Sequence, residues 1–103
     1  MRLMITFSMP TDHGNDIVGS GKIQQVFERI LHDLKPEAAY FYPEGGDRGG
    51  VFFVQCDASA DFVKLVEPLW FGLNAKVTAT PVMSGEDLMK GMASLPAIAS
   101  RYR

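Results

Sequence analysis

Apolar and polar residues alternate along residues 2–9, the first patterned segment of the chain. Leu3, Ile5, Phe7 and Met9 fall on one face, and smaller or more polar residues fall on the other. A period of two residues is typical of a β-strand with one buried face. Three further segments have the same extended character: 38–42, 51–56 and 75–83. The pattern therefore predicts four strands.

Two longer segments repeat apolar residues with the period of an α-helix, and a shorter one follows them: 22–36, 59–74 and 84–96. Pro36 is expected to end the first helix, and Ser59 to cap the start of the second. Pro68 is expected to break or tighten the second helix near Glu67, because proline removes a hydrogen bond and clashes with the preceding turn.

The segment before the first helix and the C-terminal part of the chain have weaker patterns. Residues 10–21 are rich in turn-forming residues and predict a polar loop. Asp87 follows Ser84 by three residues, which is close to a capping box, so a short third helix should start there and stop at Pro96. The tail, 97–103, has no pattern of its own.

The order of these elements predicts the fold class. Strand, helix, strand, strand, helix, strand is the ferredoxin-like βαββαβ arrangement, an α+β fold, here with an extra C-terminal helix. We expect a single domain over residues 1–103, with a four-stranded antiparallel sheet. The first and third strands should be central, and both long helices should cover one face.

Four glycines surround Asp47 and Arg48 between two aromatic segments. A phosphate-binding glycine loop is followed by a helix, whose free N–H groups hold the anion. Here a strand follows, so Gly45–Gly50 is interpreted as the bend of a β-hairpin. Arg48 is interpreted as a solvated charge at the tip of that bend, with contact to an anion or a partner chain as the alternative.

The face of the sheet turned away from the helices is unusually free of charge. We expect it to carry Met4, Thr6, Ser8, Tyr40, Tyr42, Val51, Phe53, Gln55, Thr78 and Thr80. A solvent-facing antiparallel sheet normally carries strongly polar residues, and large apolar patches are rare on monomers. A second copy of the chain is the simplest cover for this face, so the sequence predicts a homodimer.

Composition and net charge limit the kinds of partner and cellular location to be expected. The chain has 103 residues, a net charge of −2 and no basic stripe, so we expect no nucleic acid partner. No apolar segment is long enough for a membrane span or a signal peptide. Cys56 is the only cysteine. An internal disulfide is therefore impossible, and a cytoplasmic location is expected.

Four short motifs carry a resemblance to a known family: "MRLMITFSMP", "GGVFFVQCD", "PLW" and "AKVTATPVM". Over roughly residues 1–83 the chain resembles the family called domain of unknown function 3303, in the dimeric α+β barrel superfamily. That superfamily includes antibiotic-biosynthesis-type monooxygenases, muconolactone isomerases and dye-decolourising peroxidases. The resemblance implies a dimeric barrel and brings no catalytic residue with it.

The candidate pocket residues combine apolar bodies with hydrogen-bonding groups: Thr6, Tyr40, Tyr42, Gln55 and Thr78, with His13 at the rim. A ligand should lie between these strand residues and the loop 10–21. The alternative is that they pack across a dimer interface. His13 and His32 lack metal-ligand spacing, so no metal and no cofactor are expected.

Three functions stay open at this point. The first is a homodimeric barrel that binds a small, largely apolar molecule. The second is a cofactor-independent enzyme of the monooxygenase or isomerase type, which would need a histidine or an acid directed into the cavity. The third is a purely structural homodimer with a closed interface.

Overall fold

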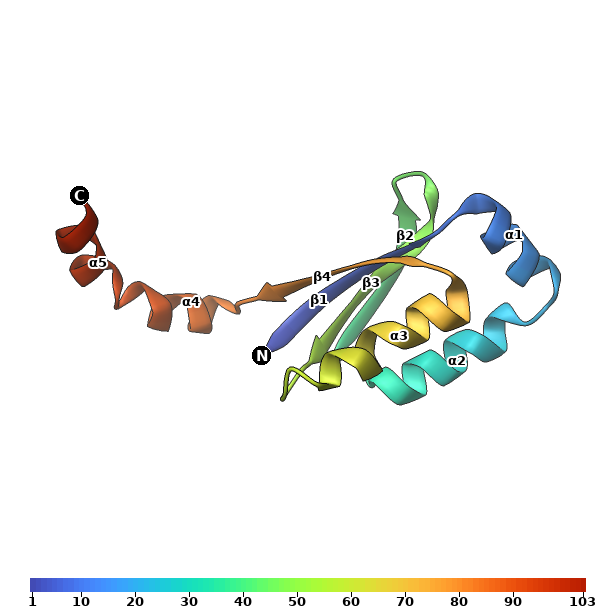
Figure 1. Cartoon of the computed structure of the whole chain (residues 1–103), viewed down its shortest axis with the longest axis horizontal. Coiled ribbons are helices and arrows are strands. Elements are labelled where there is room, and N and C mark those ends of the chain that lie inside the picture. The colour runs from blue at the N-terminus through green and yellow to red at the C-terminus, as the bar shows by residue number, and fades with distance from the viewer.

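The structure, a computed structural model, describes all residues from Met1 to Arg103 and has an α+β architecture (Figure 1). Its elements in chain order are β1 (Arg2–Met9), α1 (Thr11–Gly19), α2 (Ile23–Leu34), β2 (Ala38–Glu44), β3 (Asp47–Gln55), α3 (Asp61–Leu73), β4 (Lys76–Val82), α4 (Gly85–Met92) and α5 (Leu95–Tyr102). The four strands form one antiparallel sheet in the order β2-β3-β1-β4. The prediction that the first and third strands are central is confirmed, and the arrangement is consistent with a ferredoxin-like fold.

The alternation along β1 sorts the sheet into two faces. Leu3, Ile5, Phe7 and Met9 are all buried, and their side chains form the centre of the core. In the register of the sheet, Ile5 lies opposite Phe52 on β3 and Ala79 on β4. The expected division of the strand residues between the two faces is therefore confirmed.

Helices α2 and α3 lie side by side over the core face (Figure 1). The buried residues of their apolar stripes are Ile30 and Leu34 on α2, and Leu65, Val66, Leu69 and Leu73 on α3. The opposite face of the sheet has no element packed on it. Its residues include Tyr40, whose exposed fraction is 61%.

The glycine-rich segment is a β-hairpin, as predicted. Its turn is only Gly45 and Gly46, which have φ of +60° and +89°. Positive φ at both central residues is the requirement of a tight two-residue hairpin turn. The turn is shorter than the sequence indicated, because Gly49 and Gly50 belong to β3.

Gly49 and Gly50 lack side chains for a packing reason. A Cβ atom on Gly50 would lie 2.3 Å from the carbonyl oxygen of Tyr40 and 3.1 Å from the ring of Phe7. A Cβ on Gly49 would lie 2.2 Å from the carbonyl oxygen of Phe7. Neighbouring strands approach too closely at both positions for any larger residue.

The expectation of an irregular loop over 10–21 is wrong, because this segment contains α1. Ile17 packs against the core, and Gly14 is buried beside Met9 and Arg48. The Thr11 hydroxyl donates a hydrogen bond to the Asp47 carboxylate, with 2.7 Å between the oxygens. These tertiary contacts outweigh the turn-forming preferences of the segment, which are local and weak.

Two expectations about α3 are also wrong. Its N-cap is Ala60 rather than Ser59, and the helix continues through Pro68 without a break. The proline removes one backbone hydrogen bond, but four buried side chains hold the helix against the sheet on both sides of it. Packing of an apolar face stabilises a helix in a protein more than propensity does.

The C-terminal segment forms two helices instead of one helix and an irregular tail. The expected capping box is present: the Asp87 backbone N–H donates to the Ser84 hydroxyl, and the Ser84 backbone N–H donates to the Asp87 carboxylate. Pro96 does not end a helix but stands in the first turn of α5. No hydrogen bond is lost there, because the first turn has no intrahelical acceptor for its N–H groups.

The close approach at Gly50 gives a testable prediction. Gly50→Ala should lower the free energy of unfolding by about 1–3 kcal/mol, because the backbone of β2 must move to admit the methyl group. The measurement is urea denaturation followed by circular dichroism. Gly91→Ala is the control, since a Cβ there meets no atom within 4 Å. Equal denaturation midpoints for both variants and the wild type would contradict this packing.

Candidate ligand-binding groove

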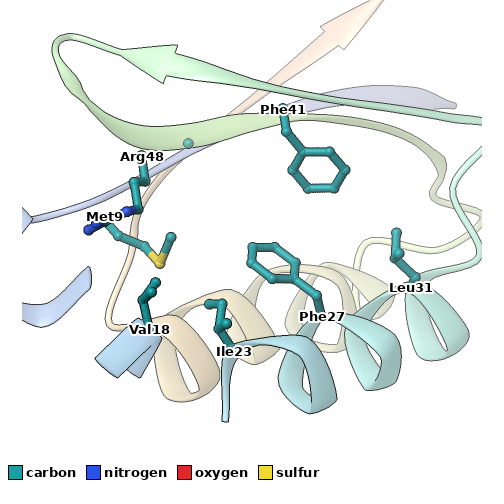
Figure 2. Close-up of a pocket in the computed structure, with 8 residues that line it drawn as sticks. Met9, Val18, Ile23, Phe27, Leu31, Phe41 and Arg48 are labelled. Atoms are coloured by element: carbon teal, nitrogen blue, oxygen red, sulfur yellow. The ribbon is translucent and has the colours of Figure 1, made fainter. Parts of the chain in front are cut away.

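A mainly apolar hollow, here called the groove, lies between the helices α1 and α2 and the hairpin end of the sheet (Figure 2). It has a volume of about 430 Å³. The residues that line it are Met9, Val18, Ile23, Phe27, Leu31, Phe41, Arg48 and Gly49. Six of these eight are hydrophobic, and none is an acid, a histidine, a serine or a cysteine. The groove thus offers apolar contact and a single charge.

Aromatic rings form a packed layer behind the groove. Phe7 stacks on Phe52, with 5.3 Å between the ring centroids. Phe27 and Phe41 meet edge to face at 5.4 Å, and Phe41 also contacts Phe52 in this way at 6.0 Å. Figure 2 shows Phe27 and Phe41 pointing toward each other from α2 and from the sheet. This cluster fixes one wall of the groove before any ligand arrives, because Phe7 and Phe52 are fully buried.

Arg48 is the one charged residue of the groove. It lies on β3 opposite Met9 of β1, and its Nη1 donates a hydrogen bond to the Asn15 side-chain oxygen at 3.0 Å. No carboxylate lies within ion-pair distance of it. Asp47, the acid next to Arg48 in sequence, accepts a hydrogen bond from the Thr11 hydroxyl. Most donors of the guanidinium are therefore available for an anion.

The sequence pattern placed Arg48 at the tip of a loop, and the structure places it on a strand at the edge of the groove. The groove as a whole was missed, because its residues come from five separate elements. No local pattern marked it: Val18 and Leu31 are apolar residues whose exposure only the fold determines. Their exposed fractions are 41% and 36%.

The structure gathers five of the six predicted site residues on the uncovered sheet face. Thr6 lies opposite Thr78 on β4 and opposite Val51 on β3, which itself lies opposite Tyr40. Thr6 and Thr78 also border a small hollow of about 190 Å³ with Glu44 and Lys76. These residues form a broad surface rather than an enclosed pocket.

His13, the sixth predicted site residue, does not join the others. It is exposed on α1, and α1 packs beside Met9 and Arg48 on the helix-covered side of the sheet. The segment 10–21 and the predicted floor therefore lie on opposite faces. The structure does not bring them together around one site.

Tyr42 and Gln55 occupy different surroundings on the uncovered face. Partial desolvation raises the pKa of the Tyr42 hydroxyl, and the nearby Glu44 carboxylate adds to this effect. Gln55 donates a hydrogen bond to Glu37 Oε1 at 2.9 Å, while Arg2 Nε donates to Glu37 Oε2 at 2.8 Å. Gln55 is thus committed to a polar cluster at the end of the sheet far from the hairpin.

Other candidate chemistry is sparse. Cys56 is buried, and its thiol donates to the carbonyl oxygen of Ala58. His32 is exposed and contacts the Asp33 carboxylate. No three His, Cys, Asp or Glu side chains are grouped closely enough to hold a metal ion. None of the helices has both the length and the apolar character that crossing a membrane requires.

Comparison with known proteins returned no matching family model and no matching curated protein.

The cluster around Glu37 predicts a pH effect. Hydrogen bonds from Gln55 and Arg2 lower the pKa of the Glu37 carboxyl. Because the folded-state pKa lies below the unfolded value of about 4.3, ionised Glu37 stabilises the fold above that pH. This contribution is lost as the pH falls through the folded-state pKa. Glu37→Gln should therefore lose less stability than the wild type between about pH 5 and about pH 3.

The measurement is the urea denaturation midpoint at several pH values across that window. Asp57→Asn is the matched control, because the Asp57 carboxylate makes no ion pair and accepts no hydrogen bond. It should show the pH dependence of the wild type. A wild-type slope in Glu37→Gln would show that the cluster does not couple to folding.

Proposed function

We propose that this protein is a homodimeric α+β barrel that binds a small, largely apolar molecule carrying one anionic group, with the groove as its binding site. The observation that carries the proposal is the single guanidinium of Arg48, without an acidic partner, at the edge of an otherwise apolar groove. Ligand sites are typically apolar surfaces with a few placed polar groups that fix orientation. A carboxylate, sulfonate or phosphate would pair with Arg48 while the apolar body rests on Phe27 and Phe41.

The groove favours binding over proton-transfer chemistry. A cofactor-independent monooxygenase or isomerase needs a base or an acid within hydrogen-bond reach of its substrate. None of the residues that line the groove offers one. The enzyme alternative therefore draws no support from this site, and a binding protein is the function that the geometry favours.

The dimer is proposed from the uncovered sheet face. Phe53 and Met4 lie opposite each other in the register, and neither is covered by a helix. Charged residues of this face stand at its ends, as Arg2, Glu44 and Lys76 do. Two such faces packed together would form the barrel that the family resemblance implies, with aromatic and hydroxyl groups at the centre of the contact.

The ligand proposal is tested with two fluorescent probes that share an apolar body. Anilinonaphthalenesulfonate carries an anion and phenylnaphthylamine does not. Arg48→Met should weaken binding of the sulfonate about tenfold, the effect of losing one hydrogen bond to a charged group. Its affinity for the neutral probe should be unchanged, since the methionine preserves the apolar stem.

Fluorescence titration gives both affinities. Arg29→Met, which removes an exposed arginine of α2 that does not line the groove, should leave both unchanged. Equal affinity of Arg48→Met and the wild type for the sulfonate would remove Arg48 from the site. Equal losses for the two probes would show that the substitution disturbs the groove rather than anion recognition.

The dimer proposal is tested by Phe53→Glu. A carboxylate buried without a partner between two sheets should cost about 3 kcal/mol or more, so the protein should become monomeric while the circular dichroism spectrum stays folded. Val63→Glu places the same charge at an exposed apolar position of α3 and should remain dimeric. Light scattering after size-exclusion chromatography reports the mass. A dimer that survives Phe53→Glu would show that another surface forms the contact.

A further inference from the structure

The last part of the chain, residues 83–103, is here called the arm. It continues the direction of β4 and extends away from the rest of the molecule, here called the body (Figure 1). No residue from 85 to 103 is buried. The arm is nevertheless regular, because its first helix begins at a complete capping box formed by Ser84 and Asp87.

The helices of the arm are amphipathic and have nothing to pack against. Leu88, Met89 and Met92 on α4 are followed by Leu95 and Ile98 on α5, and their exposed fractions run from 43% to 68%. Each helix has eight residues. Isolated helices shorter than about 12–15 residues are marginal in water, so these two need a packing partner to persist.

The chain exposes more surface to solvent than a compact monomer of its mass does. A compact monomer of 11.4 kDa exposes about 5,800 Å², whereas this chain exposes 7123 Å². The radius of gyration is 17.2 Å, against about 13 Å for a compact domain of this length. The excess is about 1,300 Å² per chain, and twice that amount falls within the range of obligate homodimer interfaces.

We propose that the arm of each copy packs its apolar side on the body of a second copy, beside the uncovered sheet face, so that two chains exchange their C-terminal arms. This inference extends the proposed dimer. Its first support is that one chain carries two unpartnered surfaces, the arm and the sheet face. A two-fold axis brings both together twice, because in such a dimer each copy offers the same surfaces to the other.

The start of the arm lies on the correct side of the sheet for this exchange. Ser84, Glu86 and Asp87 border a polar hollow together with Arg2 and Gln55, two residues of the uncovered face. β4 is an edge strand, and stacked sheets lie about 10 Å apart. The arm continues past the C-terminal end of β4, so its own sheet does not cover it and it is free to contact a partner stacked on the uncovered face.

The arm and the body carry net charges of opposite sign, which favours contact between them. Residues 1–82 contain ten acidic and seven basic residues, whereas residues 83–103 contain two acidic and three basic ones. The two basic residues of the final helix and its end, Arg101 and Arg103, have no acidic neighbour in the last turn. A weakly basic arm and an acidic body attract each other between copies.

The experiment uses the full chain with the apolar side of the arm made polar by Leu88→Ser, Met92→Ser and Ile98→Ser together. We expect the dimer dissociation constant to rise at least about a hundredfold, because three sizeable apolar side chains leave the contact. The helical signal should fall as well, since the released arm unfolds. A control with Glu86→Ser, Lys90→Ser and Arg101→Ser changes the polar side and should keep most of the affinity. Analytical ultracentrifugation gives the constant.

The exchange itself is tested by NMR on dimers mixed from isotope-labelled and unlabelled wild-type chains. Contacts between the methyl groups of Leu88 or Met92 and the other copy support the proposal. Contacts confined to the arm's own body, or an arm without contacts, overturn it. If the sheet faces do not form the dimer contact but the arms do, the result is different. Phe53→Glu then stays dimeric, while the variant with the polar arm dissociates.

Discussion

The burial of one face of β1 is the constraint on which the rest of this structure depends. β1 pairs with β3 on one side and with β4 on the other, so its backbone hydrogen bonds are satisfied in both directions. Its odd-numbered residues from Leu3 to Met9 are buried on the face that the helices cover. Because side chains alternate strictly along a strand, this burial also fixes which residues of the neighbouring strands face outward. The uncovered face is thus a direct consequence of the core.

A core of this size leaves much of the chain incompletely covered. The buried cluster is built mainly from the sheet, α2 and α3. The uncovered sheet face and the arm lie outside it, and the groove shares only Met9 with it. A domain of about 100 residues has little spare stability, so apolar surface left open at three places calls for partners. A ligand in the groove and a second chain over the face and the arm would each remove part of this surface from water.

The groove combines rigidity with one adjustable group. Phe7 and Phe52 are fixed in the core and hold Phe41 and Phe27 in place by ring contacts. Arg48, in contrast, has an exposed side chain held by a single hydrogen bond to Asn15. A preformed apolar wall limits the entropy that the protein loses when a ligand binds, and a flexible guanidinium adapts to the position of an anion. The close packing at Gly49 and Gly50 brings the strands of the hairpin near enough for this arrangement.

Much of the fold was determined by the sequence itself. The period of two along β1, the helical stripes of α2 and α3, the hairpin and the capping box at Ser84 all depend on neighbouring residues, and a pattern along the chain records them. What only the tertiary structure decided depends on contacts between distant segments. α1 forms because Ile17 and Gly14 meet the core, and α3 continues through Pro68 because its other side chains are held by the sheet. The predicted site residues Thr6, Tyr40, Tyr42, Gln55 and Thr78 share one face, as strand alternation indicated, but His13 lies on the other. The groove was not predictable, because its residues are separated along the chain and meet only when the helices pack on the sheet.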